Sequence, residues 1–212
     1  LHPQFHLLAE RFRSHFPKAF TIIATNLQYA LPKTSFLKTL PFVDMVYLSI
    51  DGVGEVYEKA RAGARFDKLI RSLEDIQSAV EENVRQTKLH INFTLSPQNY
   101  RTLPQVYELQ KKYGLASVRI NLAQNWNEEE LNPLQFDDEI VNFLEPYRQD
   151  VKGVGGWDYK DCYWPFNGIV LDVFGDIRQC IINTSMKPIG NIFTDDIEKI
   201  YNASLVFDEA RR

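Results

Sequence analysis

The chain alternates short apolar runs with longer amphipathic stretches, and this alternation restricts its fold more than any other feature. Four runs are typical of buried strands, at residues 19–25, 43–50, 89–95 and 117–121. Helical patterns precede, separate and follow them, at residues 3–16, 34–40, 66–84, 103–113 and 134–147. Because strands that alternate with helices form βα units, we predict an α/β fold with an open parallel sheet of four strands.

Polar residues follow the predicted strands at one end. The carboxyl ends of the four runs carry Thr25 and Asn26, Ser49 and Asp51, Thr94 and Ser96, and Asn121. In parallel sheets ligands bind at this end of the strands, so the pattern predicts a small-ligand site there. These residues also have a purely structural interpretation, in which Thr25 and Asn26 terminate a strand and Asp51 begins a turn. Arg61, a further candidate, would then be a solvated helix residue.

Composition excludes several classes of function. A net charge of −4 gives no electrostatic footprint for nucleic acid or for an anionic membrane surface. The apolar runs are far too short to cross a bilayer. Two cysteines do not make a secreted disulfide scaffold, so we expect a protein of the reducing cytoplasm.

The two cysteines flank a predicted β-hairpin. Residues 168–174 and 177–182 have strand patterns, and Gly175 and Asp176 form a turn dipeptide between them. Cys162 precedes this hairpin and Cys180 lies on its return strand. A glycine-containing linker at 150–160 separates it from the sheet, which predicts domains at 1–150 and 151–212. By themselves two thiols are typical of core residues, since an iron–sulfur cluster usually takes four.

Several motifs carry a resemblance to one enzyme family. The spacing Cys-x12-Gly-x4-Cys resembles the opening of the SPASM or twitch extension of radical S-adenosylmethionine (SAM) enzymes, and PIGNIF from Pro188 and DIEKIYN from Asp196 resemble the run that follows it. Upstream, LHPQF, IATNL, VDMVYLSIDG and YEKARAG resemble the core motifs "lhpdf", "i-TNG", "d-v-SlDg" and "yd-iRg", and they begin at residues 1, 23, 43 and 57.

The resemblance implies a fold, a cofactor and an activity. The fold would be a partial parallel (β/α) barrel of the TIM type, strands 3–6 of the radical SAM core, followed by a hairpin and helix of the SPASM type. The full-length enzyme would cleave SAM to a 5′-deoxyadenosyl radical that abstracts hydrogen from a peptide or small molecule. Its electrons would come from an external donor such as a flavodoxin or ferredoxin.

The resemblance also implies roles for single residues. SAM contacts are expected from Thr25, Ser49, Asp51, Arg61 and Asn121, because hydroxyls and amides suit ribose and arginine suits a carboxylate. Auxiliary [4Fe-4S] cluster ligands are expected from Cys162 and Cys180.

Two elements of the family pattern are absent from the sequence. The Cys-x3-Cys-x2-Cys loop that holds the SAM-cleaving cluster is missing, and so is the glycine-rich motif after the second core strand. We therefore expect a chain truncated at both ends and inactive by itself. The alternative is a non-catalytic α/β domain that binds a small ligand and keeps its cysteines as plain thiols.

Overall fold

The computed structural model describes residues 3–28, 35–81, 87–125, 132–133, 136–152, 170–172, 174–178, 187–196 and 198–200. The chain divides into two compact units, Leu1–Val154 and Gly155–Arg212. Each unit is described by itself.

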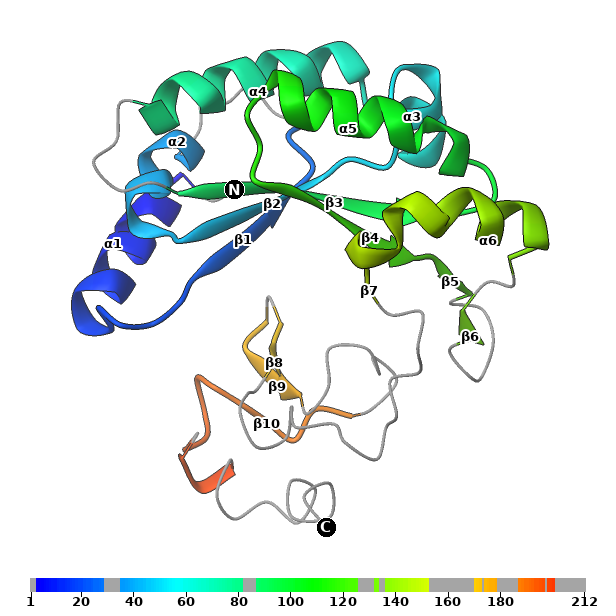
Figure 1. Ribbon diagram of the computed structural model, residues 1–212. Helices are drawn as coiled ribbons and strands as arrows, with labels where there is room; N and C mark the ends of the chain where they lie inside the picture. Colours follow the sequence, from blue (N-terminus) through cyan, green and yellow to red (C-terminus); the bar gives the residue numbers. More distant parts are fainter. Residues whose placement is uncertain are drawn as a thin grey trace. The chain divides into compact units, whose positions relative to one another are not determined.

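The first unit is built on one parallel sheet (Figure 1). Its strands lie in the order β1-β2-β3-β4-β7, and their bounds are Ile22–Thr25, Met45–Ser49, Lys88–Leu95, Ser117–Leu122 and Val151–Lys152. Neighbouring strands are parallel throughout, with Ser49 opposite Asn92 and Thr94 opposite Asn121. The predicted α/β class and partial parallel sheet are confirmed, and the carboxyl ends of the strands share one edge.

Two parts of the sequence prediction are wrong. The sheet has five strands and not four, and the first residues of the predicted linker at 150–160 belong to the fifth strand. Val151 and Lys152 form β7, a fifth parallel strand that pairs with Ile120 and Asn121 of β4. A two-residue strand is too short to show a period-2 pattern, and backbone hydrogen bonds alone define it. The loop after β4 likewise contains two short antiparallel strands, β5 Gln124–Asn125 and β6 Asn132–Pro133.

Helices connect the strands of the first unit. Their bounds are α1 Phe5–His15, α2 Phe36–Thr39, η2 Leu40–Phe42, α3 Glu55–Ala60, α4 Phe66–Glu81, η3 Tyr100–Thr102, α5 Leu103–Lys112, α6 Asp138–Leu144 and η4 Glu145–Asp150. Helices α3, α4 and α5 lie on one face of the sheet (Figure 1). Helix α3, which the sequence did not predict, is a six-residue turn between β2 and α4. No helix in the described ranges has the length and apolarity needed to cross a bilayer.

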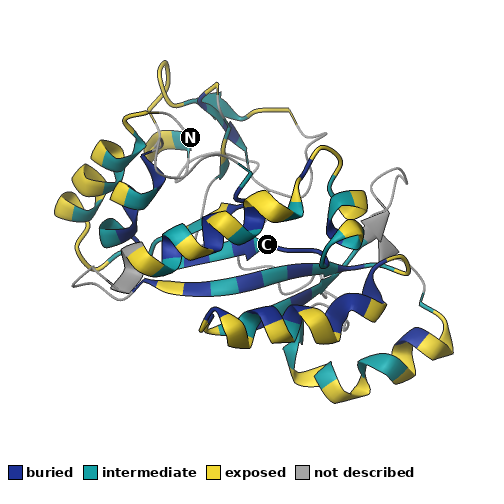
Figure 2. Ribbon diagram, turned by 90° about the horizontal axis from the view of Figure 1, so that it is seen from above, coloured by how far each residue is buried: buried dark blue, intermediate teal, exposed yellow. Residues whose placement is uncertain are grey.

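Local sequence explains where two helices lie and which face they bury. Leu69, Leu73 and Ile76 of α4 recur at helical spacing and are buried, so this helix packs its apolar stripe on the sheet. Asp137 caps α6 by accepting a hydrogen bond from the backbone N–H of Ile140 at 2.9 Å. Viewed from above, the helices show exposed residues outward and buried residues toward the strands (Figure 2).

The strands are apolar on one face and polar on the other. Every second residue belongs to the core shared with the helices, namely Val46, Leu48, Ile91, Phe93, Val118 and Ile120. The intervening residues are half-buried and form what we call the polar face, made of Tyr47, Ser49, His90, Asn92, Thr94, Ser117, Arg119 and Asn121. Parallel strands are usually apolar on both faces, so a polar second face is a departure that points to a binding surface.

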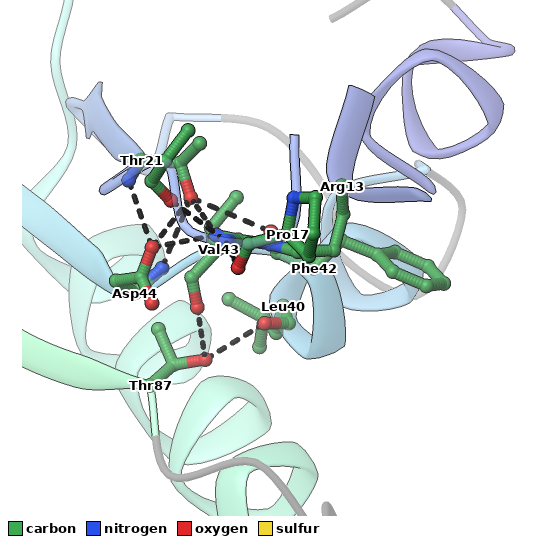
Figure 3. Close-up of polar contacts among 9 residues, drawn as sticks. Arg13, Pro17, Thr21, Leu40, Phe42, Val43, Asp44 and Thr87 are labelled. Carbon is green, nitrogen blue, oxygen red and sulfur yellow. Dashed lines mark hydrogen bonds and ion pairs between the residues drawn. The ribbon is translucent and has the colours of Figure 1, made fainter. Parts of the chain in front are cut away.

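Helix α1 is tied to the amino ends of β1 and β2 by one arginine (Figure 3). The guanidinium of Arg13 donates to Asp44 Oδ2 at 2.6 Å and to Thr21 Oγ1 at 2.7 Å. It also donates to three backbone carbonyl oxygens, those of Pro17, Ala19 and Phe42. Asp44 Oδ2 accepts from the Thr21 backbone N–H as well, at 2.8 Å. At this edge of the sheet the Arg13 guanidinium and Asp44 Oδ2 are therefore satisfied by hydrogen bonds within the protein.

The second unit contains a three-stranded antiparallel sheet in the order β10-β9-β8. Its strands are β8 Val170–Leu171, β9 Asp176–Arg178 and β10 Gly190–Asn191. The antiparallel pairing of β8 with β9 agrees with the predicted hairpin, and β10 is a strand that the sequence did not predict. Gly175 has φ +82°, and a Cβ there would lie 2.5 Å from the Phe193 ring, so glycine is required at this turn.

Candidate functional site

Asp51 joins the carboxyl ends of β2 and β3 to helix α3. Its Oδ1 accepts a hydrogen bond from the Thr94 backbone N–H at 2.7 Å. Its Oδ2 forms an ion pair with Arg61 Nη2, also at 2.7 Å, and the residue is buried. Both carboxylate oxygens therefore have protein partners, so Asp51 fixes the geometry of this edge. The sequence predicted Asp51 and Arg61 separately, and the structure brings them together.

Two glycines let the chain turn directly from β2 into α3. Gly52 has φ +152° and Gly54 has φ +59°, conformations that other residues rarely adopt. A Cβ on Gly52 would lie 3.1 Å from the Tyr57 backbone nitrogen. The tight turn places Arg61, at the end of α3, beside Asp51.

Asn99 stabilises the loop that follows β3 through hydrogen bonds of its side chain. Its Nδ2 donates to the Asp51 carbonyl at 3.0 Å and to the Thr94 carbonyl at 2.8 Å. Its Oδ1 accepts from the Ser96 backbone N–H at 2.7 Å. Asn99 is buried, and the sequence analysis missed it. The run Ser96-Pro-Gln-Asn directly after a strand is a turn signal that could have identified it.

A pocket of about 590 Å³ opens beside these residues, a size typical of small-molecule sites. Its lining includes polar groups from the end of β2, from α3, and from the end of β3 and the loop that follows it, namely Asp51, Lys59, Thr94, Ser96 and Asn99.

The polar face carries a row of side chains at the same edge. Asn121 Nδ2 donates to Asn92 Oδ1 at 2.7 Å, and Asn92 lies opposite Ser49 in the register of β2 and β3. The structure therefore aligns two predicted residues, Ser49 and Asn121, on one face with Asn92 between them. Hydroxyl and amide groups both donate and accept, so this row suits a ligand rich in hydroxyls.

Thr25 differs from the other predicted residues. It is buried, and it shares the alternation of Ile23, whose side chain packs on the core. Its Oγ1 accepts a hydrogen bond from the Leu27 backbone N–H at 3.2 Å. Leu27 has φ +55°, at the position where the family motif "TNG" has glycine. Thr25 thus stabilises a left-handed bend, and Asn26 is the exposed residue at the end of β1.

The polar face also holds groups deeper along the strands. His90 Nδ1 and Ser117 Oγ are 2.8 Å apart, and the rings of His90 and Tyr47 are 5.9 Å apart. Burial, followed by the charge of Lys88, lowers the pKa of His90, so the ring is neutral at pH 7. His90 is therefore a residue of the sheet whose ring lies on the polar face. Tyr47, Asn92 and Arg119 were missed, although the period-2 alternation of their strands could have found them.

Both predicted iron–sulfur ligands, Cys162 and Cys180, lie outside the described residues. Within the ranges that the structure describes, no group of three or more His, Cys, Asp or Glu side chains is placed to hold a metal ion.

Comparison with known proteins identifies a fold. No protein-family model and no curated protein matches the chain. Three solved structures of Streptococcus suis SuiB resemble it, with TM-scores of 0.68, 0.71 and 0.68 and sequence identities of 15%, 16% and 15%. The matches cover 98%, 97% and 97% of this chain and 54%, 53% and 52% of the SuiB chain. The chain therefore spans about half the length of SuiB.

The three SuiB structures differ in what they contain. The second is bound to S-adenosylmethionine, and the third is bound to the precursor peptide SuiA. At these identities the likeness establishes the α/β partial-barrel fold of this chain, in agreement with the fold expected from the sequence motifs.

Proposed function

We propose that this chain is part of a radical SAM enzyme and that SAM binds at the carboxyl ends of β2, β3 and β4. The observation that carries the proposal is the group Ser49, Asn92 and Asn121 on the polar face. It lies at the same strand ends from which Asp51 and Thr94 line a pocket of about 590 Å³. Two further facts support it. The sequence motifs resemble that family, and the fold resembles a protein that has been solved with SAM.

The proposed contacts divide into direct and supporting ones. The Ser49 hydroxyl and the Asn121 amide lie on the open polar face and would bind the ribose hydroxyls. Arg61 is paired with Asp51, and its Nε has no hydrogen-bond partner among the described residues. That nitrogen is buried, but the Arg61 side chain as a whole is 26% exposed, and its guanidinium would bind the carboxylate of the cofactor. Asp51 and Thr25 would position these groups through the contacts already described.

Cys162 and Cys180 are proposed as ligands of an auxiliary iron–sulfur cluster. Thiolates suit such clusters, but four are usually needed and the sequence has two. The sequence also lacks the Cys-x3-Cys-x2-Cys motif, so we propose that the chain by itself binds SAM without cleaving it. The radical chemistry would be supplied by the cofactor and its cluster, and the residues described here would bind and orient.

The proposed substrate is a peptide, and the proposed electron source is an external flavodoxin or ferredoxin. The peptide is favoured because the similar protein SuiB has been solved with a precursor peptide. A small-molecule substrate is the alternative. Incubation of the full-length gene product with each class, SAM and a chemical reductant distinguishes the two by the product that forms.

The first experiment is equilibrium dialysis of the 212-residue chain against labelled SAM. Ser49→Ala should weaken binding about tenfold through the loss of one hydrogen bond to the ribose. Ser78→Ala is the matched control, because Ser78 is an exposed residue of α4 whose hydroxyl bonds only within the helix. Equal affinity of the two variants for SAM would overturn the proposed site.

The second experiment tests the cluster. Anaerobic reconstitution of the full-length gene product with iron and sulfide should give a brown protein whose absorbance weakens on Cys162→Ala and on Cys180→Ala. A colourless protein that also fails to bind SAM would favour the rival function, a non-catalytic α/β domain that binds another small ligand.

A further inference from the structure

Arg119 is a cation on the polar face, and no described residue supplies a matching anion. It lies in β4, it is half-buried, and its two hydrogen bonds go to neutral groups. Its Nε donates to Asn121 Oδ1 at 3.3 Å, and its Nη1 donates to the Tyr47 hydroxyl oxygen at 3.4 Å. Both distances are long for hydrogen bonds of a charged donor, which are usually about 2.7–2.9 Å.

Within the described part of the chain, no carboxylate lies within ion-pair distance of Arg119. The alternation of the strands explains why. On β2, β3 and β4 the positions that share its face carry Met45, Tyr47, Ser49, Lys88, His90, Asn92, Thr94, Ser117 and Asn121, and none of these is acidic. Half-burial of a cation without a counter-ion costs free energy, and such a cost is typical of a site that awaits an anionic partner.

The surroundings of Arg119 suit a carboxylate in particular. Its guanidinium is 5.7 Å from the Tyr47 ring, which orients the planar group. The Tyr47 oxygen accepts from Arg119, so its own O–H remains available as a donor to the same ligand. A planar guanidinium binds a carboxylate through two parallel hydrogen bonds.

We propose that Arg119, assisted by the Tyr47 hydroxyl, binds a carboxylate of the peptide substrate. The inference rests on the proposed function, because it places substrate beside the proposed cofactor row. Arg119 is two residues before Asn121 along β4, about 7 Å away on the same face, and the register places it opposite Asn92, which lies opposite Ser49. A substrate anchored there would present its neighbouring atoms to a ligand held by Ser49 and Asn121.

The carboxylate could belong to an acidic side chain or to a peptide C-terminus, and three probe peptides separate these sources. They are acetyl-Gly-Glu-Gly-amide, acetyl-Gly-Gln-Gly-amide and acetyl-Gly-Gly-Gly with a free C-terminus. Calorimetric titration of the 212-residue chain, with SAM present, should show that at least one of the two carboxylate peptides binds about tenfold more tightly than the glutamine peptide. The carboxylate peptide that binds identifies the source.

Three variants test the residue. Arg119→Gln should abolish the preference for the carboxylate peptide, and Arg119→Lys should retain part of it because the charge remains. Arg71→Gln is the control, since Arg71 is an exposed arginine of α4 paired with Asp67, and it should keep the full preference. Circular dichroism of each variant confirms that it is folded, and the lysine variant keeps the test decisive if the glutamine variant is unstable.

The outcomes separate the two proposals. Equal binding of the carboxylate and glutamine peptides, or a preference that survives Arg119→Gln, overturns the role of Arg119. If the unmutated chain does not bind SAM but still prefers the carboxylate peptide, the proposed cofactor site is overturned and the carboxylate site remains supported.

Discussion

Two arginines show how differently the two ends of the sheet are built. Arg13, at the amino ends of β1 and β2, makes five hydrogen bonds, one of them to a carboxylate at 2.6 Å (Figure 3). Arg119, on the polar face near the carboxyl ends, makes two long bonds to neutral groups. An arginine therefore stabilises the fold at the amino ends of the strands, whereas another arginine, on the polar face, remains available to bind a partner.

The two arginines differ in how far their hydrogen-bonding groups are satisfied by other groups of the protein. A buried network that is complete strengthens the fold, whereas an incomplete one costs desolvation energy. Parallel α/β folds place binding at the carboxyl ends of the strands, so the opposite end is free to serve stability alone. Four changes test this division between Arg13 and Arg119, and they follow in order of expected effect.

Removal of Arg13 should cause the largest loss. Arg13→Ala leaves Asp44, whose side chain is 17% exposed, without its cation, and should lower the free energy of unfolding by about 3 kcal/mol. Urea denaturation followed by circular dichroism measures the change. Arg11→Ala, in the same helix but exposed, should change stability by less than about 0.5 kcal/mol. Similar losses for the two variants would contradict the role of the network.

Asn99 should matter next, because it locks the loop at the binding edge. Asn99→Ala leaves two buried carbonyls, those of Asp51 and Thr94, without a donor and should cost about 2 kcal/mol of stability. SAM binding should weaken as well, since the pocket loses its shape. Asn99→Asp keeps the acceptor for Ser96 but replaces the donor with a charged oxygen that faces the same two carbonyls, so it should weaken the same two properties. Unchanged SAM affinity in both variants would separate this loop from the site.

Arg119 should behave oppositely to Arg13. Arg119→Gln removes a half-buried charge that has no ion-pair partner in the described ranges, and it should leave the free energy of unfolding unchanged or raise it by up to about 1 kcal/mol. The same urea experiment measures it. A loss as large as that of Arg13→Ala would mean that Arg119 has a structural role and would remove the contrast between the two ends.

The smallest effect concerns pH. Burial, and then Lys88, lowers the pKa of His90 from its ordinary value of 6.5, so the folded state binds this proton less readily than the unfolded state. Stability is therefore full above pH 6.5 and falls as pH drops from there toward the folded pKa. His90→Gln should flatten that part of the profile of urea midpoints. If the His90→Gln variant kept the slope of the unmutated chain, the pH dependence would belong to the other histidines.

The sequence predicted the main elements because their patterns are long. The strand at 89–95 and the helix at 66–84 each show several periods, and both formed within a few residues of the predicted bounds. Strand β7 could not be predicted, because two residues define no period. Helix α3 depends on the positive φ of Gly52 and Gly54, which a sequence shows only as two glycines.

The candidate site was predicted in part. Ser49 and Asn121 were predicted because they lie at the carboxyl ends of predicted strands. In the structure Asn92 links them, since it lies opposite Ser49 in the register and accepts a hydrogen bond from Asn121. Thr25 was predicted at the same edge, but the run that contains it does not alternate between apolar and polar residues and so does not reveal which face Thr25 occupies. Arg119 lies inside a strand, and what distinguishes it is the lack of a counter-ion among the described residues, which only the folded chain reveals.

Hydrogen–deuterium exchange with and without SAM tests the central claim most directly, because it reports both ends of the sheet in one measurement. The account predicts slower exchange at the carboxyl ends of β2, β3 and β4, around residues 49–52, 94–96 and 121–123, and unchanged exchange around residues 13, 21 and 44. Protection at the Arg13 end instead, or no protection at either end at saturating SAM, would contradict it.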